Sequence, residues 1–249
     1  MRESREFASE IKFQVPDFAG EAILEWARDR LSPDPNASNG STQNDAYQIT
    51  SLYFDTEDYD VYHRNGSFGR SKYRIRRYGP SRTVFLERKL KTRGLVSKRR
   101  ASVSIDELAR LQGVDPEADW PGFWYHQRLL ARRLKPICQI CYHRIARVAL
   151  TSYGPIRLTV DRCIQAVPLH QVGFDDSAGG VALSDNQVIV EFKFRMAMPA
   201  LFKEVVERFA LNPRRISKYR LAAVALGLVE PAEDSEALPE PEKPICLNS

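Results

Sequence analysis

Three consecutive segments within residues 72–103 carry positive charges on one face of a predicted β-strand, and this pattern constrains the fold more than any other feature. A strand places every second side chain on the same face, so the pattern is read with a period of two. The breaker pair Gly79-Pro80 separates the first segment from the second. The cations that share a face are Lys72, Arg74 and Arg76 in the first segment, Lys89 and Lys91 in the second, and Lys98 and Arg100 in the third.

Such faces cannot pack on an apolar core, because an unpaired buried charge costs several kcal/mol. A solvated face of an antiparallel sheet is the simplest alternative, but like charges directly across a ladder repel each other. We therefore expect an α+β fold built on an antiparallel β-barrel, whose polar, basic interior binds a polyanion in a tunnel or deep cleft. The apolar strand faces are expected to point outward under helices.

Composition is ordinary for a globular protein: 43% of the 249 residues are hydrophobic and 28% are charged. No apolar run approaches the roughly 20 residues needed to cross a bilayer, so we expect no membrane span and a cytoplasmic location. Residues 230–249 are acidic and rich in proline, and are predicted to be a disordered tail with a net charge of −5. The remaining domain, residues 1–229, then carries +10, which favours an anionic partner.

The rest of the chain alternates between strands and helices. Strands are expected over residues 10–15, 47–56, 137–150, 156–164 and 188–195, and helices over 17–31, 104–111, 123–134, 199–209 and 217–228. Residues 32–45 are predicted to be a flexible loop and residues 165–183 to be mostly turns. Asp55, at the end of a strand, is either an acid of the site or a cap of the following turn.

Several kinds of catalytic site have little support. Neither a P-loop nor a GxGxxG pattern occurs, and the four histidines are widely scattered. Cys138 and Cys141 have zinc-like spacing, but a structural zinc site normally needs two such pairs. We therefore expect free, reduced thiols.

The order and spacing of eight motifs over residues 7–221 resemble the VTC domain, the polyphosphate polymerase branch of the triphosphate tunnel metalloenzymes in the CYTH-like superfamily. Each motif is weak alone, and only the combination is specific. The motifs are Glu10-x-Lys12-Phe13, SLYFDT, KYRIRRYG, FLERKLK followed by SKRR, Tyr142-x-Arg144, IRLTVD, VIVEFKF and RRISKYR.

The resemblance implies a tunnel in which basic residues bind a triphosphate or polyphosphate while a carboxylate holds Mn²⁺ or Mg²⁺. Glu191 matches the metal ligand, although a salt bridge to Lys193 is the simpler alternative. Arg215 stands where the family pattern suggests lysine. The residues implied to act on phosphate are Lys12, Arg74, Arg76, Lys89 and Lys98 as catalytic groups, with Tyr142, Arg144, Arg157, Lys193, Ser217 and Lys218 binding substrate.

The function implied is a polyphosphate polymerase that transfers the γ-phosphoryl group of ATP, or of another nucleoside triphosphate, to a growing chain. Phosphoryl transfer depends on positioning and charge neutralisation, which lysine, arginine and a metal supply. A metal-dependent triphosphatase or polyphosphatase is the first alternative. It is less favoured, because Lys12 replaces the second carboxylate of the ExExK opening of the hydrolase branches. A non-catalytic polyanion-binding module is the second alternative. Nucleic acid is not expected as a partner, because the cation-bearing faces hold few aromatic residues.

Overall fold

The computed structural model describes residues 9–35, 45–92, 95–176 and 179–231. Its strands are β1 (Ser9–Pro16), β2 (Ser32–Pro33), β3 (Ala46–Asp55), β4 (Arg70–Tyr78), β5 (Thr83–Thr92), β6 (Leu95–Ser104), β7 (Lys135–Thr151), β8 (Gly154–Pro168), β9 (Val181–Ala182) and β10 (Gln187–Phe194). Its helices are α1 (Asp17–Arg28), α2 (Asp60–His63), α3 (Phe123–Ala131), α4 (Ala200–Arg208) and α5 (Lys218–Ala225), with 3₁₀ turns η2 (Gly66–Phe68) and η3 (Ile105–Gln112).

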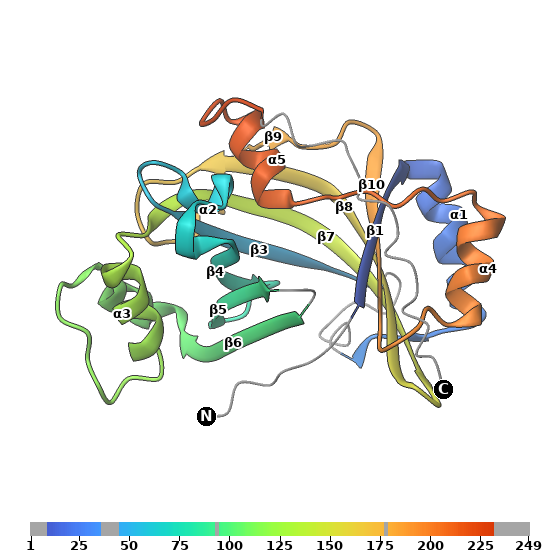
Figure 1. Cartoon of the computed structure of the whole chain (residues 1–249), viewed down its shortest axis with the longest axis horizontal. Coiled ribbons are helices and arrows are strands. Elements are labelled where there is room, and N and C mark those ends of the chain that lie inside the picture. The colour runs from blue at the N-terminus through green and yellow to red at the C-terminus, as the bar shows by residue number, and fades with distance from the viewer. Residues whose placement is uncertain (1–8, 36–44, 93–94, 177–178, 232–249) are drawn as a thin grey trace, which may run out of the picture.

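The strands form one antiparallel sheet in the order β1-β10-β8-β7-β3-β4-β5-β6, with β2 beside β7 and β9 beside β8. The long strands β7 and β8 cross the middle of the molecule (Figure 1). Helices α1 and α4 lie together beside β1 and β10, while α3 lies at the opposite end and α5 near β8 (Figure 1). The α+β class and the antiparallel sheet are as predicted.

One face of β1, β10 and β8 forms an apolar core with α1 and α4. The rings of Phe13 on β1 and Phe192 on β10 lie 5.0 Å apart, and Phe202 of α4 stacks on Phe192 at 4.4 Å. All three side chains are fully buried. Trp26 of α1 joins the two helices by donating a hydrogen bond to Glu204 of α4 over 3.1 Å. Alternation in the sequence therefore directs one strand face to the helices, as expected.

A second apolar core lies behind β3, β4 and β5. Leu52, Ile75 and Leu86 stand side by side on these three strands and are fully buried. Helix α3 covers this region, where Tyr125 meets Phe54 edge-on with 6.0 Å between ring centroids. Burying each such side chain contributes roughly 1.5–3 kcal/mol. The two cores leave the other face of the sheet, hereafter the inner face, for the charged residues.

The sheet is not closed by backbone hydrogen bonds, so the predicted barrel is not shown. In the part of the chain that the structure describes, β1 and β6 are the two edges of the ladder. The sheet nevertheless curls, because Lys89 of β5 donates to Glu10 of β1 over 2.5 Å although five strands separate β1 from β5 in the sheet order. An ion pair between side chains therefore bridges the gap that a backbone ladder would close in a full barrel.

Some local predictions need correction. Most described residues in 165–183 lie outside strands and helices, in line with the prediction, but β8 continues to Pro168 and the two-residue strand β9 pairs with it. Within the predicted loop 32–45, β2 pairs with β7, while residues 36–44 lie outside the described residues. The same holds for residues 232–249 of the predicted tail. The expected helices are all present, in slightly shorter forms, and Ser104 and Glu107 form the expected capping box.

Asp55 is the cap of a turn and not an acid of the inner face. Its carboxylate accepts hydrogen bonds from the backbone N–H groups of Thr56, Val61 and Tyr62 over 2.7–2.9 Å and from the hydroxyl of Tyr219 over 2.5 Å. The side chain is fully buried. Asp55 therefore fixes the start of α2 and its contact with α5, which was the simpler of the two sequence interpretations.

Candidate functional site

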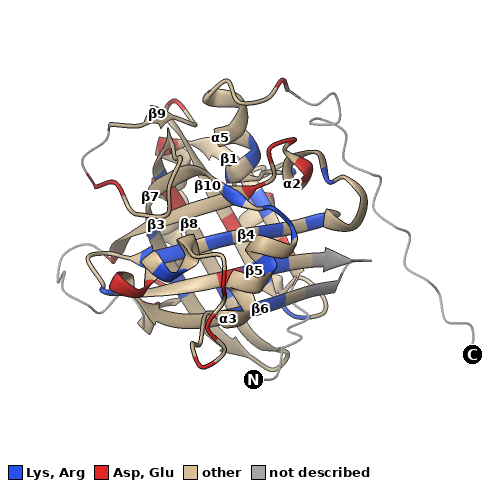
Figure 2. Ribbon diagram, turned by 90° about the vertical axis from the view of Figure 1, so that its left-hand side faces the viewer, with Lys and Arg blue, Asp and Glu red and all other residues tan. Residues whose placement is uncertain are grey.

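The strand register gathers the basic residues of β4, β5 and β6 on the inner face. Arg74 stands opposite Glu87, and Glu87 stands opposite Arg100. Two residues further along each strand, and on the same face, Lys72, Lys89 and Lys98 stand opposite one another on β4, β5 and β6. Figure 2 shows the resulting bands of Lys and Arg running across β4, β5 and β6.

The other half of the inner face comes from β1, β10, β8 and β7. Lys12 stands opposite Glu191, and Glu10 stands opposite Lys193. Lys193 is in turn opposite Arg157 on β8. Arg144 lies opposite Asp161 and binds it with two hydrogen bonds of 2.6 and 2.8 Å.

Helix α5 brings two more predicted residues to this face. The hydroxyl of Ser217 accepts a hydrogen bond from Lys72 over 2.9 Å and also caps the first turn of α5. Lys218 donates to Asp161 over 2.5 Å and lies 4.7 Å from the ring centroid of Tyr142. All the site residues predicted from the sequence therefore lie on one face. Arg157 lies near the edge of this face and forms an ion pair with Asp34 over 2.7 Å.

Positive charge exceeds negative charge on this face. Among the described side chains of the two halves and α5, eleven cations stand beside five carboxylates. The cations are Lys12, Lys72, Arg74, Arg76, Lys89, Lys98, Arg100, Arg144, Arg157, Lys193 and Lys218, and the carboxylates are Glu10, Asp34, Glu87, Asp161 and Glu191. An anion bound between these strands relieves the repulsion that remains.

Glu87 is the acid at the centre of the β4–β6 half. Its carboxylate, 1% exposed, contacts Arg74 over 2.7 Å, Lys98 over 2.8 Å and Arg100 over 3.2 Å. Burial alone would raise the pKa of Glu87, but the surrounding guanidinium and ammonium groups hold it far below its usual range. Asp161 plays the same part in the other half, where Arg144 and Lys218 overcome burial and lower its pKa to about 2.

Two cations of the inner face have no carboxylate in contact among the described residues. Arg76 is 7% exposed, and its guanidinium donates only to neutral hydroxyls, those of Ser51 over 3.2 Å and Tyr142 over 3.1 Å. Lys72 donates to Ser217. Burial, followed by repulsion from Lys12, lowers the pKa of Lys72 well below its ordinary value. A buried cation without an acid is the signature of a place for an anionic ligand.

Two carboxylates could hold a metal ion at this face. Glu191, 7% exposed, lies 3.4 Å from Lys193 and 3.8 Å from Lys12, and Glu10 lies 3.2 Å from Lys193. The salt bridge to Lys193, left open by the sequence, is thus present. Although burial opposes ionisation, Lys193 and the other cations keep the pKa of Glu191 well below its ordinary value.

The described residues contain no group of three or more His, Cys, Asp and Glu side chains suited to a metal. A hard cation that takes one or two carboxylates and completes its shell with substrate phosphates and water still fits Glu10 and Glu191. A cation bound entirely by protein ligands does not fit.

Sequence reasoning missed part of the site. The family resemblance gave Lys72 and Arg100 no phosphate-binding role, although the alternation already placed each on the same strand face as predicted site residues. The partners of Glu87 and Asp161 could not be found, because contacts such as Arg144 to Asp161 and Lys98 to Glu87 depend on the register of different strands.

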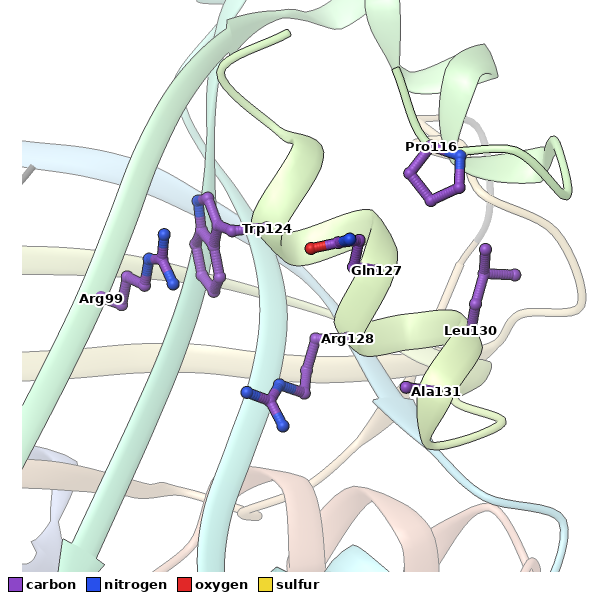
Figure 3. A pocket seen from close by; sticks show the side chains of 7 residues that line it. All are labelled: Arg99, Pro116, Trp124, Gln127, Arg128, Leu130 and Ala131. Carbon is purple, nitrogen blue, oxygen red and sulfur yellow. The ribbon is translucent and has the colours of Figure 1, made fainter. Parts of the chain in front are cut away.

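A separate hollow of about 510 Å³ lies on the other side of β6 (Figure 3). Arg99, whose guanidinium lies 4.4 Å from the ring centroid of Trp124, lines it together with Gln127 and Arg128 of α3. Arg99 has the opposite strand parity from Lys98 and Arg100. The hollow therefore does not belong to the inner face.

The family model of the VTC domain matches residues 7–226 of the chain. No curated protein matches the chain. Within the described residues, no helix has the length and apolar character needed to span a membrane.

Solved structures with the same fold include a candidate adenylate cyclase from Bacillus halodurans, with 14% identity, a TM-score of 0.50, and coverage of 87% of this chain and 96% of that one. A protein from Pyrococcus horikoshii has 13% identity and a TM-score of 0.44, with 86% and 97% coverage. A candidate adenylyl cyclase from Hippeastrum, described as having a dominant triphosphatase activity, has 14% identity and a TM-score of 0.46, with 86% and 94% coverage. At 14% identity and a TM-score of 0.50, the Bacillus halodurans structure shows the fold and not the activity.

Proposed function

The chain belongs to the VTC domain family, and we propose from this membership and its inner face that it is a metal-dependent polyphosphate polymerase. Its substrates are ATP, or another nucleoside triphosphate, and a growing polyphosphate chain. The γ-phosphoryl group of the nucleotide is transferred to the terminal phosphate of that chain. The nucleoside diphosphate leaves, so the bond broken on the nucleotide is replaced by one on the polymer.

The observation that carries the proposal is the buried guanidinium of Arg76, which contacts no acid among the described residues, as is also true of Lys72. A protein that needed these cations only for its own stability would pair them with carboxylates, as it pairs Arg162 of β8 with Glu21 of α1. Here hydroxyl groups hold the cations in position and leave their charge available. Phosphate oxygens supply the negative charge that both groups lack.

Each part of the inner face has a role in phosphoryl transfer. Arg74 and Arg76 grip phosphate oxygens through several N–H groups, which fixes the orientation of the transferred group. Lys72, Lys89 and Lys98 neutralise the charge that spreads over these oxygens as the bond breaks. No covalent nucleophile from the protein is required.

On the other half of the face, Lys12, Arg144 and Arg157 bind the phosphates of the chain, with Lys193 and Lys218 beside them. Tyr142 and Ser217 contribute hydroxyl donors. Glu191, with Glu10 beside it, is the carboxylate that would hold Mg²⁺ or Mn²⁺, and a bound ion would supply positive charge to the phosphates.

The test is to incubate the purified protein with ATP and Mn²⁺ or Mg²⁺ and to resolve the products by gel. We expect a ladder of polyphosphate chains that depends on the metal. Release of inorganic phosphate without a ladder would replace the polymerase by a triphosphatase acting at the same site. Binding of tripolyphosphate without any turnover would replace both by a polyanion-binding module with a steep salt dependence.

A pair of variants makes this assay specific to the inner face. Arg74→Ala combined with Arg76→Ala should weaken tripolyphosphate binding and abolish the ladder. Arg99→Ala removes a cation from the outer side of β6 and should leave both unchanged. Equal effects of the two changes would mean that general positive charge, and not the inner face, accounts for binding.

A further inference from the structure

A cluster of aromatic rings stands at one end of the basic inner face. The ring centroid of Tyr78 on β4 lies 6.2 Å from that of Tyr47 on β3 and 5.7 Å from that of Phe85 on β5. The guanidinium of Arg100 lies 3.5 Å from the centroid of the Phe85 ring and 5.7 Å from that of Tyr78. We expected few aromatic residues on the cation-bearing faces, and the cluster shows that this expectation was wrong at this end of the inner face.

The cluster is not simply part of an apolar core. Tyr47 and Tyr78 pack against the edge of the second apolar core but are only half-buried, and the half-buried Phe85 lies outside both apolar clusters of the described residues. The polar ends are held in place, since Arg157 donates to the hydroxyl of Tyr47 over 2.9 Å and Arg100 to that of Tyr78 over 3.4 Å. Half-exposed rings with fixed positions retain surface for a flat ligand.

The cluster also lies at a suitable distance from the phosphate-binding residues. Phe85 stands directly opposite Arg76, and Tyr78 follows Arg76 by two residues on the same face of β4. At a rise of roughly 3.3 Å per residue, Tyr78 is about 7 Å from Arg76 and about 13 Å from Arg74 along the strand. A triphosphate held by the two arginines can therefore place the attached nucleoside over the rings.

We infer that the rings of Tyr47, Tyr78 and Phe85, with Arg100, bind the base of the nucleoside triphosphate donor by stacking. This assignment rests on the proposed function and adds the donor's base subsite to it. Every base has a π-face, so such a platform favours nucleotides over inorganic chains without selecting one base. Polyphosphate itself gains nothing from the rings.

The experiment measures the affinities of ATP and tripolyphosphate for the full chain by calorimetry without turnover, in the presence of Ca²⁺ and at fixed salt. In Tyr78→Leu and in Phe85→Leu the affinity for ATP should fall about 5- to 100-fold, while that for tripolyphosphate stays within about twofold. Tyr78→Phe keeps the ring and should retain most of the ATP affinity. Phe18→Leu, which removes a ring that is 76% exposed on α1, is the matched control and should change neither.

The outcomes separate this inference from the proposed function. If the wild type does not bind tripolyphosphate, the phosphate site itself is wrong. If it binds, but both leucine variants lower the two affinities equally or not at all, the stacking platform is wrong and the proposed function stands. Thermal unfolding of each variant with tripolyphosphate bound identifies a leucine variant that fails to fold. In that case the other leucine variant tests the inference: a fall in its ratio of ATP affinity to tripolyphosphate affinity supports the stacking platform, and an unchanged ratio contradicts it.

Discussion

Replacing Glu87 by Gln removes the single negative charge at the centre of three inner-face cations. The carboxylate is 1% exposed and contacts Arg74, Lys98 and Arg100 over 2.7–3.2 Å. Removing one partner of a buried ion pair leaves an uncompensated charge and costs about 3–5 kcal/mol. For a domain of this size, each kcal/mol shifts the Tm by about 2–4 °C, so we expect a decrease of about 6–20 °C.

Anions should restore part of this loss. Free tripolyphosphate at a hundred times the wild-type Kd stabilises the folded wild type by about 2.7 kcal/mol. The same concentration stabilises the variant by more if the variant binds tripolyphosphate more tightly. We expect tighter binding, because Glu87→Gln frees the cations from their internal counter-charge. Thermal unfolding with and without tripolyphosphate measures both effects.

The matched control is Glu57→Gln. Glu57 is 86% exposed in its side chain and lies 3.4 Å from Lys135 at the surface. An exposed pair of this kind contributes at most about 1 kcal/mol, so the Tm should hardly change. A Glu87→Gln protein as stable as this control, or one that anions stabilise less than the wild type, would refute the electrostatic reasoning.

Three further predictions concern pH. Burial lowers the pKa of Lys89 to about 8, so tripolyphosphate affinity measured by calorimetry should fall as the pH rises through 8, and Lys89→Met should flatten that profile. Because the folded state disfavours the charged form of Lys89, this lysine should add stability between pH 8 and its ordinary pKa of 10.5, and a decrease there would contradict the assignment. Neighbouring cations outweigh burial and hold the pKa values of Glu10 and Asp161 at about 2, below their ordinary 4.5 and 3.8. The stability they contribute should be complete above pH 4.5 and be lost as the pH falls toward 2, and denaturant titrations that found it unchanged over that range would refute this.

The local features of this fold could be predicted from the sequence because they depend on short spacings. The alternation in KYRIRRY places Arg74 and Arg76 on one face whatever the rest of the chain does. The capping box at Ser104 likewise uses only residues three apart. These features, with the order of the motifs, were enough for the family and the class of fold.

The long-range features could not be predicted. The contact of Lys89 with Glu10 joins residues 79 positions apart and depends on how far the sheet curls. That curl also decides whether the sheet closes, and because the sheet stays open the expected barrel is not shown. The aromatic cluster was missed for the same reason, because Tyr47, Tyr78 and Phe85 come together only across three strands.

The most direct test of the account is to measure ATP turnover and tripolyphosphate affinity together in Glu191→Gln. This change keeps the shape of the side chain and removes the charge that we assign to the metal. We expect most metal-dependent turnover to be lost while tripolyphosphate still binds, because the cations of the inner face are intact. Full metal-dependent activity in Glu191→Gln would contradict the assignment, and Glu10 would then be the remaining carboxylate for the ion, since Glu87 is already occupied by three cations.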